Sequence, residues 1–163
     1  MDLDISLEKL LEELAAELRA RGWMLATAES CTGGMIAASC TRLAGSSEWF
    51  ERGFVTHNNT AKTELLDVPA EVIVQHGAVS EPVARAMAEG ALRHSRAQVS
   101  VSVTGIAGPG GGSADKPVGT VWMGWCMGGV TLAECRHFGG SRHGMRYGAT
   151  AHALLKLLEH VRG

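Results

Sequence analysis

The stretch from Trp23 to Leu43 restricts the fold most, because a strand, a tight turn and a helix follow one another within it. The apolar run 23–28 predicts a strand buried on both faces, AESCTGG at 28–34 a turn, and 34–43 a helix. A side chain at such a turn lies past the strand end, beside the partly positive N-terminus of the helix. Ser30 is therefore either a helix cap or a nucleophile with main-chain N–H groups ready to stabilise an oxyanion.

The remaining patterns predict one domain over residues 1–163, an α/β fold of three layers (α/β/α) around a mixed sheet. The sheet is mixed because a hairpin turning at Gly128 and Gly129 forces at least one antiparallel neighbour. Helices are expected over 6–21, about 60–66, 69–75, 80–94 and 142–161. Ser80 is the expected cap of one of these helices, and Asn59 or Thr60 of another. Further strands are expected over 52–56, 98–104, 117–126 and 130–138.

The composition is ordinary for a soluble globular protein and gives no sign of a nucleic-acid or membrane partner. The 163 residues carry a net charge of −2 and no run of Lys or Arg, and no apolar run approaches the length of a membrane span. The four cysteines (Cys31, Cys40, Cys126 and Cys135) form no CxxC pair, which is typical of reduced thiols in a cytoplasmic protein. The seven histidines show no metal-ligand spacing, so no metal and no cofactor is expected.

Unusual residues follow three of the expected strands. Ser30 follows the first, His57 and Lys62 follow the second, and Thr104 leads into the glycine-rich loop 105–112. Ligands of such sheets bind beyond the carboxyl ends of the strands, so these ends indicate a shared site.

Each of these residues has a chemical and a plainer interpretation. Ser30 as a nucleophile needs a base, and Lys62 or His57 could serve; a desolvated lysine loses its proton near neutral pH. The loop 105–112 brings main-chain N–H groups close to an anion, or is a surface loop. Arg142 and Arg146 lie in the opening turns of the last helix, where the helix dipole disfavours a cation. A phosphate partner would explain them, and two solvent-exposed arginines are an about equally good explanation.

Four strings in one order resemble the CinA C-terminal domain family in its stand-alone form, nicotinamide-nucleotide amidase. They are AESCTGG at 28–34, GSSEWFERGFVTHNNTAK at 45–62, QHGAVSEPVA at 75–84 and TGIAGPGGGSADKPVGTVW at 104–122. The resemblance implies a CinA C-terminal-like α/β/α fold. It also implies hydrolysis of nicotinamide mononucleotide to nicotinate mononucleotide and ammonia, in pyridine-nucleotide salvage and NAD metabolism.

The resemblance also implies roles for individual residues. Ser30 matches the nucleophile and Lys62 the base, and His57 stands where the family usually has a tyrosine thought to relay a proton between them. An imidazole has a donor and an acceptor nitrogen, so His57 can act as that relay. The expected substrate-binding residues are Cys31, Thr32, Gly33, Gly34, Thr104, Gly105, Gly108, Arg142 and Arg146.

Two other classes of protein remain open at this point. The replacement of tyrosine by His57 is also consistent with a catalytically weak or inactive nucleotide-binding module with a regulatory role. An interaction domain that merely keeps the fold is the third. Trp49, Trp122 and Trp125 exceed what a small core obviously needs, which makes a homo-oligomer plausible, although core packing is the simpler account.

Overall fold

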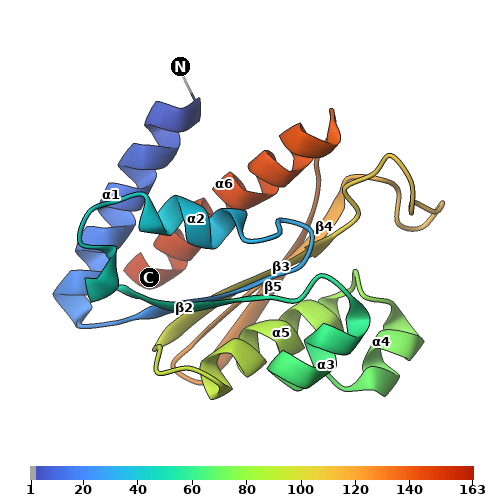
Figure 1. Cartoon of the computed structure of the whole chain (residues 1–163), viewed down its shortest axis with the longest axis horizontal. Helices are drawn as coiled ribbons and strands as arrows, with labels where there is room; N and C mark the ends of the chain where they lie inside the picture. The colour runs from blue at the N-terminus through green and yellow to red at the C-terminus, as the bar shows by residue number, and fades with distance from the viewer. Residues whose placement is uncertain (1–2) are drawn as a thin grey trace.

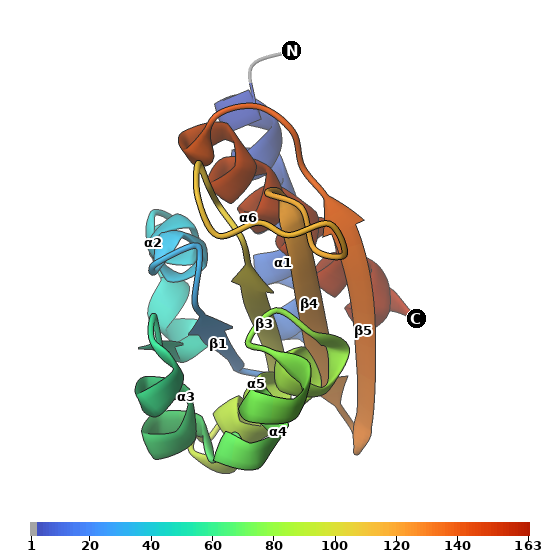
Figure 2. The same cartoon turned by 90° about the vertical axis from the view of Figure 1, so that its right-hand side faces the viewer.

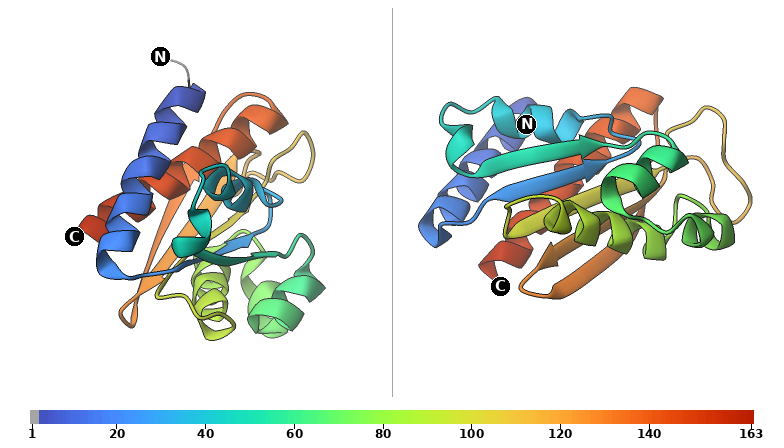
Figure 3. Two further views of the ribbon diagram at one scale, coloured as in Figure 1. Left: turned by 60° about the vertical axis from the view of Figure 1, so that its left-hand side comes forward. Right: turned by 60° about the horizontal axis from the view of Figure 1, so that its bottom comes forward.

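A computed structural model describes residues 3–163 of the chain, and the side chains from residue 6 onward. A five-stranded sheet in the order β2-β1-β3-β4-β5 separates two layers of helices (Figures 1 and 3). Three helices cover one face, α1 (Leu3–Arg21), α2 (Met35–Thr41) and α6 (Arg142–Arg162). Three helices cover the other, α3 (Asn59–Leu66), α4 (Ala70–His76) and α5 (Glu81–Arg93). The three-layer α/β/α prediction is confirmed.

The sheet is mixed, as the hairpin required. Strand β1 (Leu25–Glu29) pairs in parallel with β2 (Phe50–Val55) and with β3 (Val99–Gly105). Strand β4 (Thr120–Met127) runs antiparallel to β3 and to β5 (Val130–His137). The turn between β4 and β5 has positive φ at Gly128 and Gly129, which is the backbone a two-residue hairpin favours.

The two faces of the sheet have separate cores. Leucines of α1, the valines of β3 and the apolar stripe of α6 form one core. Ala26 and Ala28 of β1 pack with α3, α4 and α5 in the other. Apolar and polar residues alternate along β3, yet the face with the polar residues is not exposed. Ser100 and Ser102 on that face are fully buried, and their hydroxyls donate to the Ala88 and Ala84 carbonyls of α5. All five residues of β1 are buried, as its composition predicted.

Two helix caps differ from the sequence predictions. The side chain that caps α3 is Asn58, whose Oδ1 accepts from the Ala61 N–H at 2.9 Å, rather than Asn59 or Thr60. Ser80 does precede α5, but its hydroxyl donates to the Gly77 carbonyl and makes no cap hydrogen bond. In both cases the loop geometry before the helix decides which side chain reaches a free main-chain group.

The C-terminal ends of β1 and β3 lie at one edge of the sheet (Figure 2), and parallel pairing with β1 places the C-terminal end of β2 at the same edge. Main-chain hydrogen bonds continue the ladder past these ends, from the Ser30 N–H to the Val103 carbonyl and from the Thr56 N–H to the Glu29 carbonyl. The segments that follow the three strands are thereby held side by side. The loop between β3 and β4 arches outward from the same edge (Figure 2).

Candidate active site

Ser30 and Lys62 are in direct contact at this edge. The Lys62 Nζ lies 3.0 Å from the Ser30 Oγ and 3.0 Å from the Thr56 carbonyl oxygen, with the His57 carbonyl at 3.5 Å. Lys62 is 1% exposed and Ser30 is 7% exposed. The predicted pairing of these two strand ends is therefore present, with Lys62 delivered from the first turn of the Asn58-capped helix α3.

The surroundings of Lys62 favour its neutral amine. Burial lowers the pKa of the Lys62 amine below its ordinary value, and the neighbouring Cys31 only partly opposes this. Among the described residues no carboxylate forms an ion pair with Lys62, and its acceptors are a hydroxyl and uncharged carbonyls. Once deprotonated, the amine can accept the Ser30 hydroxyl proton across the same 3.0 Å contact.

The thiol beside Ser30 is a poor competitor for the role of nucleophile. Burial raises the pKa of the Cys31 thiol to about 12, so the reactive thiolate is scarce at neutral pH. Its Sγ also packs against Gly105, where an added Cβ would lie 3.0 Å away. Cys31 is therefore a packing residue of the turn, and Gly105 leaves the room for it.

Glu29, which the sequence analysis missed, holds the start of α2. Its fully buried carboxylate accepts hydrogen bonds from the Ile36 N–H at 2.8 Å, the Ala37 N–H at 3.0 Å and the Thr32 hydroxyl at 2.6 Å. A carboxylate at a helix N-terminus is favoured by the dipole. Glu29 thus caps α2, a role for which Ser30 was one of the predicted candidates. The signal in the sequence was an acidic residue at the end of an otherwise apolar strand.

Residues 30–34, called the nucleophile turn after the predicted role of Ser30, lead into α2. Some N–H groups of this turn and of the first residues of α2 are hydrogen-bonded within the protein, and others are not. Those of Ile36 and Ala37 bind Glu29, that of Gly33 binds the Ser30 carbonyl, and that of Met35 binds the Thr32 carbonyl. Within residues 3–163, the N–H groups of Cys31, Thr32 and Gly34 have no main-chain acceptor. Gly34 has φ +103°, a conformation that favours glycine, and it is partly exposed.

The histidine at the end of β2 presents its backbone to the pair. The His57 carbonyl lies 3.5 Å from both Lys62 Nζ and Ser30 Oγ, whereas the residue itself is exposed. The ring has no hydrogen-bond partner among residues 3–163. The structure thus brings the main chain of His57, and not its ring, to the Ser30–Lys62 pair. The predicted relay role of His57 stays a prediction.

Thr104 and the two arginines contact main-chain carbonyls. The Thr104 hydroxyl donates to the Ala78 carbonyl at 2.9 Å, which fixes the segment before α5. Arg142 donates to the Gly108 carbonyl of the glycine-rich loop at 2.9 Å. Arg146 donates to the Cys31 and Thr32 carbonyls. Thr104 follows a strand that ends at the same edge as the strands before Ser30 and Lys62, and the two arginines reach this edge from α6. Their roles in binding a substrate stay predictions.

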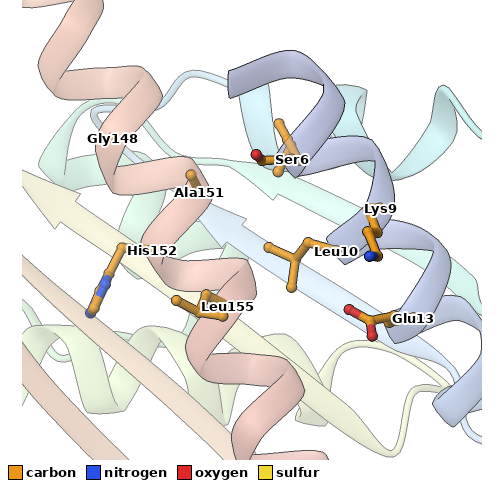
Figure 4. Close-up of a pocket in the computed structure, with 9 residues that line it drawn as sticks. Ser6, Lys9, Leu10, Glu13, Gly148, Ala151, His152 and Leu155 are labelled. Carbon is orange, nitrogen blue, oxygen red and sulfur yellow. The ribbon is translucent and has the colours of Figure 1, made fainter. Parts of the chain in front are cut away.

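A separate groove of about 550 Å³ runs between α1 and α6 (Figure 4). Its lining is mainly apolar, with Leu10 and Leu155 facing each other across it. His152 at its edge is paired with Glu134 at 2.7 Å. None of its lining residues belongs to the Ser30–Lys62 pair, so the groove is not part of the candidate active site.

Comparison with known proteins agrees with this geometry. Residues 7–161 match the family described as CinA C-terminal domain. The chain belongs to the CinA C-terminal domain family. A relative from Escherichia coli K12, named nicotinamide-nucleotide amidohydrolase PncC, is 52% identical over 157 residues that cover 94% of each chain. The crystal structure of the competence/damage inducible protein CihA from Agrobacterium tumefaciens superposes with a TM-score of 0.92 at 43% identity, covering 96% of each chain.

Longer members of the family carry this domain as a part. A CinA-like protein from Syntrophobacter fumaroxidans is 51% identical over 155 residues, which are 92% of this chain and 36% of that protein. The family resemblance drawn from the four sequence strings is thereby confirmed.

Within the described residues, no helix is both long and apolar enough to cross a membrane.

The three hydrogen bonds of the buried Glu29 carboxylate predict that this side chain stabilises the fold. We expect Glu29→Gln to lower the free energy of unfolding by about 1–3 kcal/mol, since an amide leaves one of three buried donors without an acceptor. Urea denaturation followed by circular dichroism measures this change. Glu48→Gln, which alters an exposed ion pair with Arg19, is the control and should change stability by less than about 0.5 kcal/mol. Equal stability of both variants would contradict the role given to Glu29.

Proposed function

We propose that this protein is a nicotinamide-nucleotide amidase that hydrolyses nicotinamide mononucleotide to nicotinate mononucleotide and ammonia. The observation that carries the proposal is the 3.0 Å contact between Ser30 Oγ and the buried Lys62 amine, which carries no counter-charge. The name of the Escherichia coli relative, nicotinamide-nucleotide amidohydrolase, supports the choice of substrate. Such a reaction belongs to pyridine-nucleotide salvage, and we place it in the cytoplasm. The four free cysteines are consistent with a reducing compartment.

The reaction proceeds through an acyl-enzyme. The neutral Lys62 amine takes the proton of the Ser30 hydroxyl as Oγ attacks the carboxamide carbon, giving a tetrahedral oxyanion. The resulting Lys62 ammonium then gives that proton to the departing amide nitrogen, so that ammonia leaves and an ester remains on Ser30. Water attacks this ester with Lys62 again acting as base, which releases the carboxylic acid and restores the serine.

The main chain of the turn stabilises the oxyanion. The N–H groups of Cys31 and Gly34 are the donors that we assign, because Thr32 is fully buried and the other N–H groups of the turn are bonded within the protein. Fixed donors of this kind are worth about 2.7–4 kcal/mol of barrier each. Gly33 and the Thr32 side chain support the shape of the turn.

The phosphate of the substrate fits the loop that begins at Gly105. Its glycines, among them Gly108 with φ +77°, let main-chain N–H groups approach an anion, and Arg142 stands beside them. Arg142 is exposed and donates to the Gly108 carbonyl in the free protein. Both features favour Arg142 as the cation that meets the phosphate, with Thr104 fixing the wall of the site through Ala78.

Ammonia release from nicotinamide mononucleotide tests the proposal. We expect turnover by the wild-type protein and a loss of at least about 1,000-fold in Ser30→Ala, because the nucleophile is removed. Full ammonia release by Ser30→Ala would contradict the proposed mechanism.

The same assay decides between the amidase and a catalytically weak nucleotide-binding module. The exposed His57 ring, without a partner in residues 3–163, is the observation that favours the second candidate. His57→Tyr should change turnover by less than about 10-fold if the direct Ser30–Lys62 contact suffices. An inactive wild-type protein that gains turnover as His57→Tyr would support the binding module instead.

The lowered pKa of Lys62 predicts the pH dependence. Because the neutral amine is the base, kcat/KM should rise with pH and level off once Lys62 has lost its proton. Burial lowers this pKa, so the midpoint should lie below the ordinary lysine value of 10.5. The pH profile of kcat/KM between pH 6 and about 10 measures it. Lys62→Arg, which stays charged throughout this range, should be inactive at every pH; a rate that rises with pH in this variant would contradict the assignment.

We also propose that the protein forms a homo-oligomer, on the basis of an apolar groove on its surface rather than of its tryptophans. Trp49 and Trp125 are fully buried in the core and Trp122 is half-buried, so the tryptophans leave little aromatic surface for an interface. The apolar groove between α1 and α6, where Leu155 is 43% exposed, is the surface that supports self-association (Figure 4). Light scattering should give a multiple of 17.2 kDa for the wild type and a smaller mass for Leu155→Glu. A monomeric wild type would contradict this.

A further inference from the structure

Arg146 reaches from α6 across to the nucleophile turn. Its Nε donates to the Cys31 carbonyl at 2.9 Å and its Nη2 to the Thr32 carbonyl at 3.2 Å. Gly33 leaves room for this approach, since an added Cβ there would lie 3.0 Å from Nη2. The planar guanidinium spans two successive carbonyls in a fixed fork, which a lysine cannot reproduce.

These contacts fix the orientation of two peptide units. The C=O and N–H of a trans peptide point in opposite directions, so a held carbonyl also sets the N–H of the next residue. The two held units are those between Cys31 and Thr32 and between Thr32 and Gly33. Neither unit carries an assigned oxyanion donor, but both lie between the peptide units that carry the Cys31 and Gly34 N–H groups, so the spacing of those two donors depends on them.

The guanidinium of Arg146 also lies against the residue next to Ser30, since it donates to the Cys31 carbonyl. Burial raises the pKa of the Cys31 thiol, and the charge of Arg146 opposes that effect only in part. A cation behind the turn favours negative charge on the oxyanion without touching it. Glu29 on the other side of the turn is committed to the α2 N-terminus, so the two opposite charges hold the turn from different elements.

We infer that Arg146 is a positioning residue that holds the nucleophile turn and its oxyanion donors, rather than a ligand of the substrate phosphate. This inference rests on the proposed amidase function. It also divides the two arginines of α6, because Arg142 contacts the glycine-rich loop and Arg146 contacts the turn.

Measurements of turnover and of substrate binding distinguish a positioning residue from a ligand of the substrate phosphate. A phosphate ligand acts already in the bound ground state, whereas a positioning residue acts mainly on the chemical step. In Arg146→Gln we expect kcat for ammonia release from nicotinamide mononucleotide to fall about 100-fold. The Kd of nicotinamide mononucleotide, measured by calorimetry in the Ser30→Ala background, should change by less than about 3-fold.

Matched variants complete the experiment. Arg142→Gln should weaken that Kd by about 10-fold or more, and Arg162→Gln, on the same helix but paired with Glu13 and Glu17, should change neither quantity. Arg146→Lys, which keeps the charge without the fork, should have a kcat between wild type and Arg146→Gln. An unchanged kcat together with a weakened Kd in Arg146→Gln would overturn the inference.

A second measurement does not depend on turnover. The amide resonances of Thr32 and Gly33 report the hydrogen bonds of the two preceding carbonyls, and both should shift in Arg146→Gln but not in Arg162→Gln. Unshifted resonances would overturn the positioning role. An inactive wild-type protein would instead contradict the proposed amidase, while these resonances would still decide whether Arg146 holds the turn.

Discussion

The burial of one lysine amine is the constraint on which the rest of this structure depends. Lys62 is surrounded by neutral acceptors, and its charge has no carboxylate partner among the described residues. Desolvation of a charged amine without a counter-charge is costly. That cost lowers the pKa of the amine below its ordinary value. The same burial that opposes folding therefore shifts Lys62 toward the neutral form that the proposed base requires.

The sheet makes this arrangement possible by joining parallel and antiparallel strands. Because β1, β2 and β3 run in parallel, their carboxyl ends deliver Ser30, Lys62 and the glycine-rich loop to one edge. The antiparallel β4 and β5 extend the sheet without a further crossover and lead the chain back to α6. Helix α6 starts at that same edge and supplies both arginines. Each part of the site thus comes from a different segment of sequence.

The nucleophile turn is held by charge as well as by backbone geometry. Glu29 binds the first N–H groups of α2, and Arg146 binds two carbonyls of the turn. Glu29 accepts from main-chain N–H groups that would otherwise be unsatisfied at the helix start. Arg146 donates to the Cys31 carbonyl and shares the Thr32 carbonyl with the Met35 N–H. Gly33 and Gly34 adopt positive φ, which lets the chain turn tightly between them. Within residues 3–163, this bonding leaves the N–H groups of Cys31, Thr32 and Gly34 without a main-chain acceptor.

The sequence by itself determined the order of the elements, the mixed sheet and the family, and it narrowed the partner of Ser30 to Lys62 or His57. Period-2 and helical patterns, glycines at turns and residues following strand ends are local signals, and parallel strands bring such ends together. Only the tertiary structure decided what each polar group bonds. It assigned the α2 cap to Glu29, the α3 cap to Asn58, the His57 contact to a carbonyl, and the Arg146 fork to the turn. Those choices depend on distances of a few ångströms between segments far apart in the chain, which no local pattern encodes.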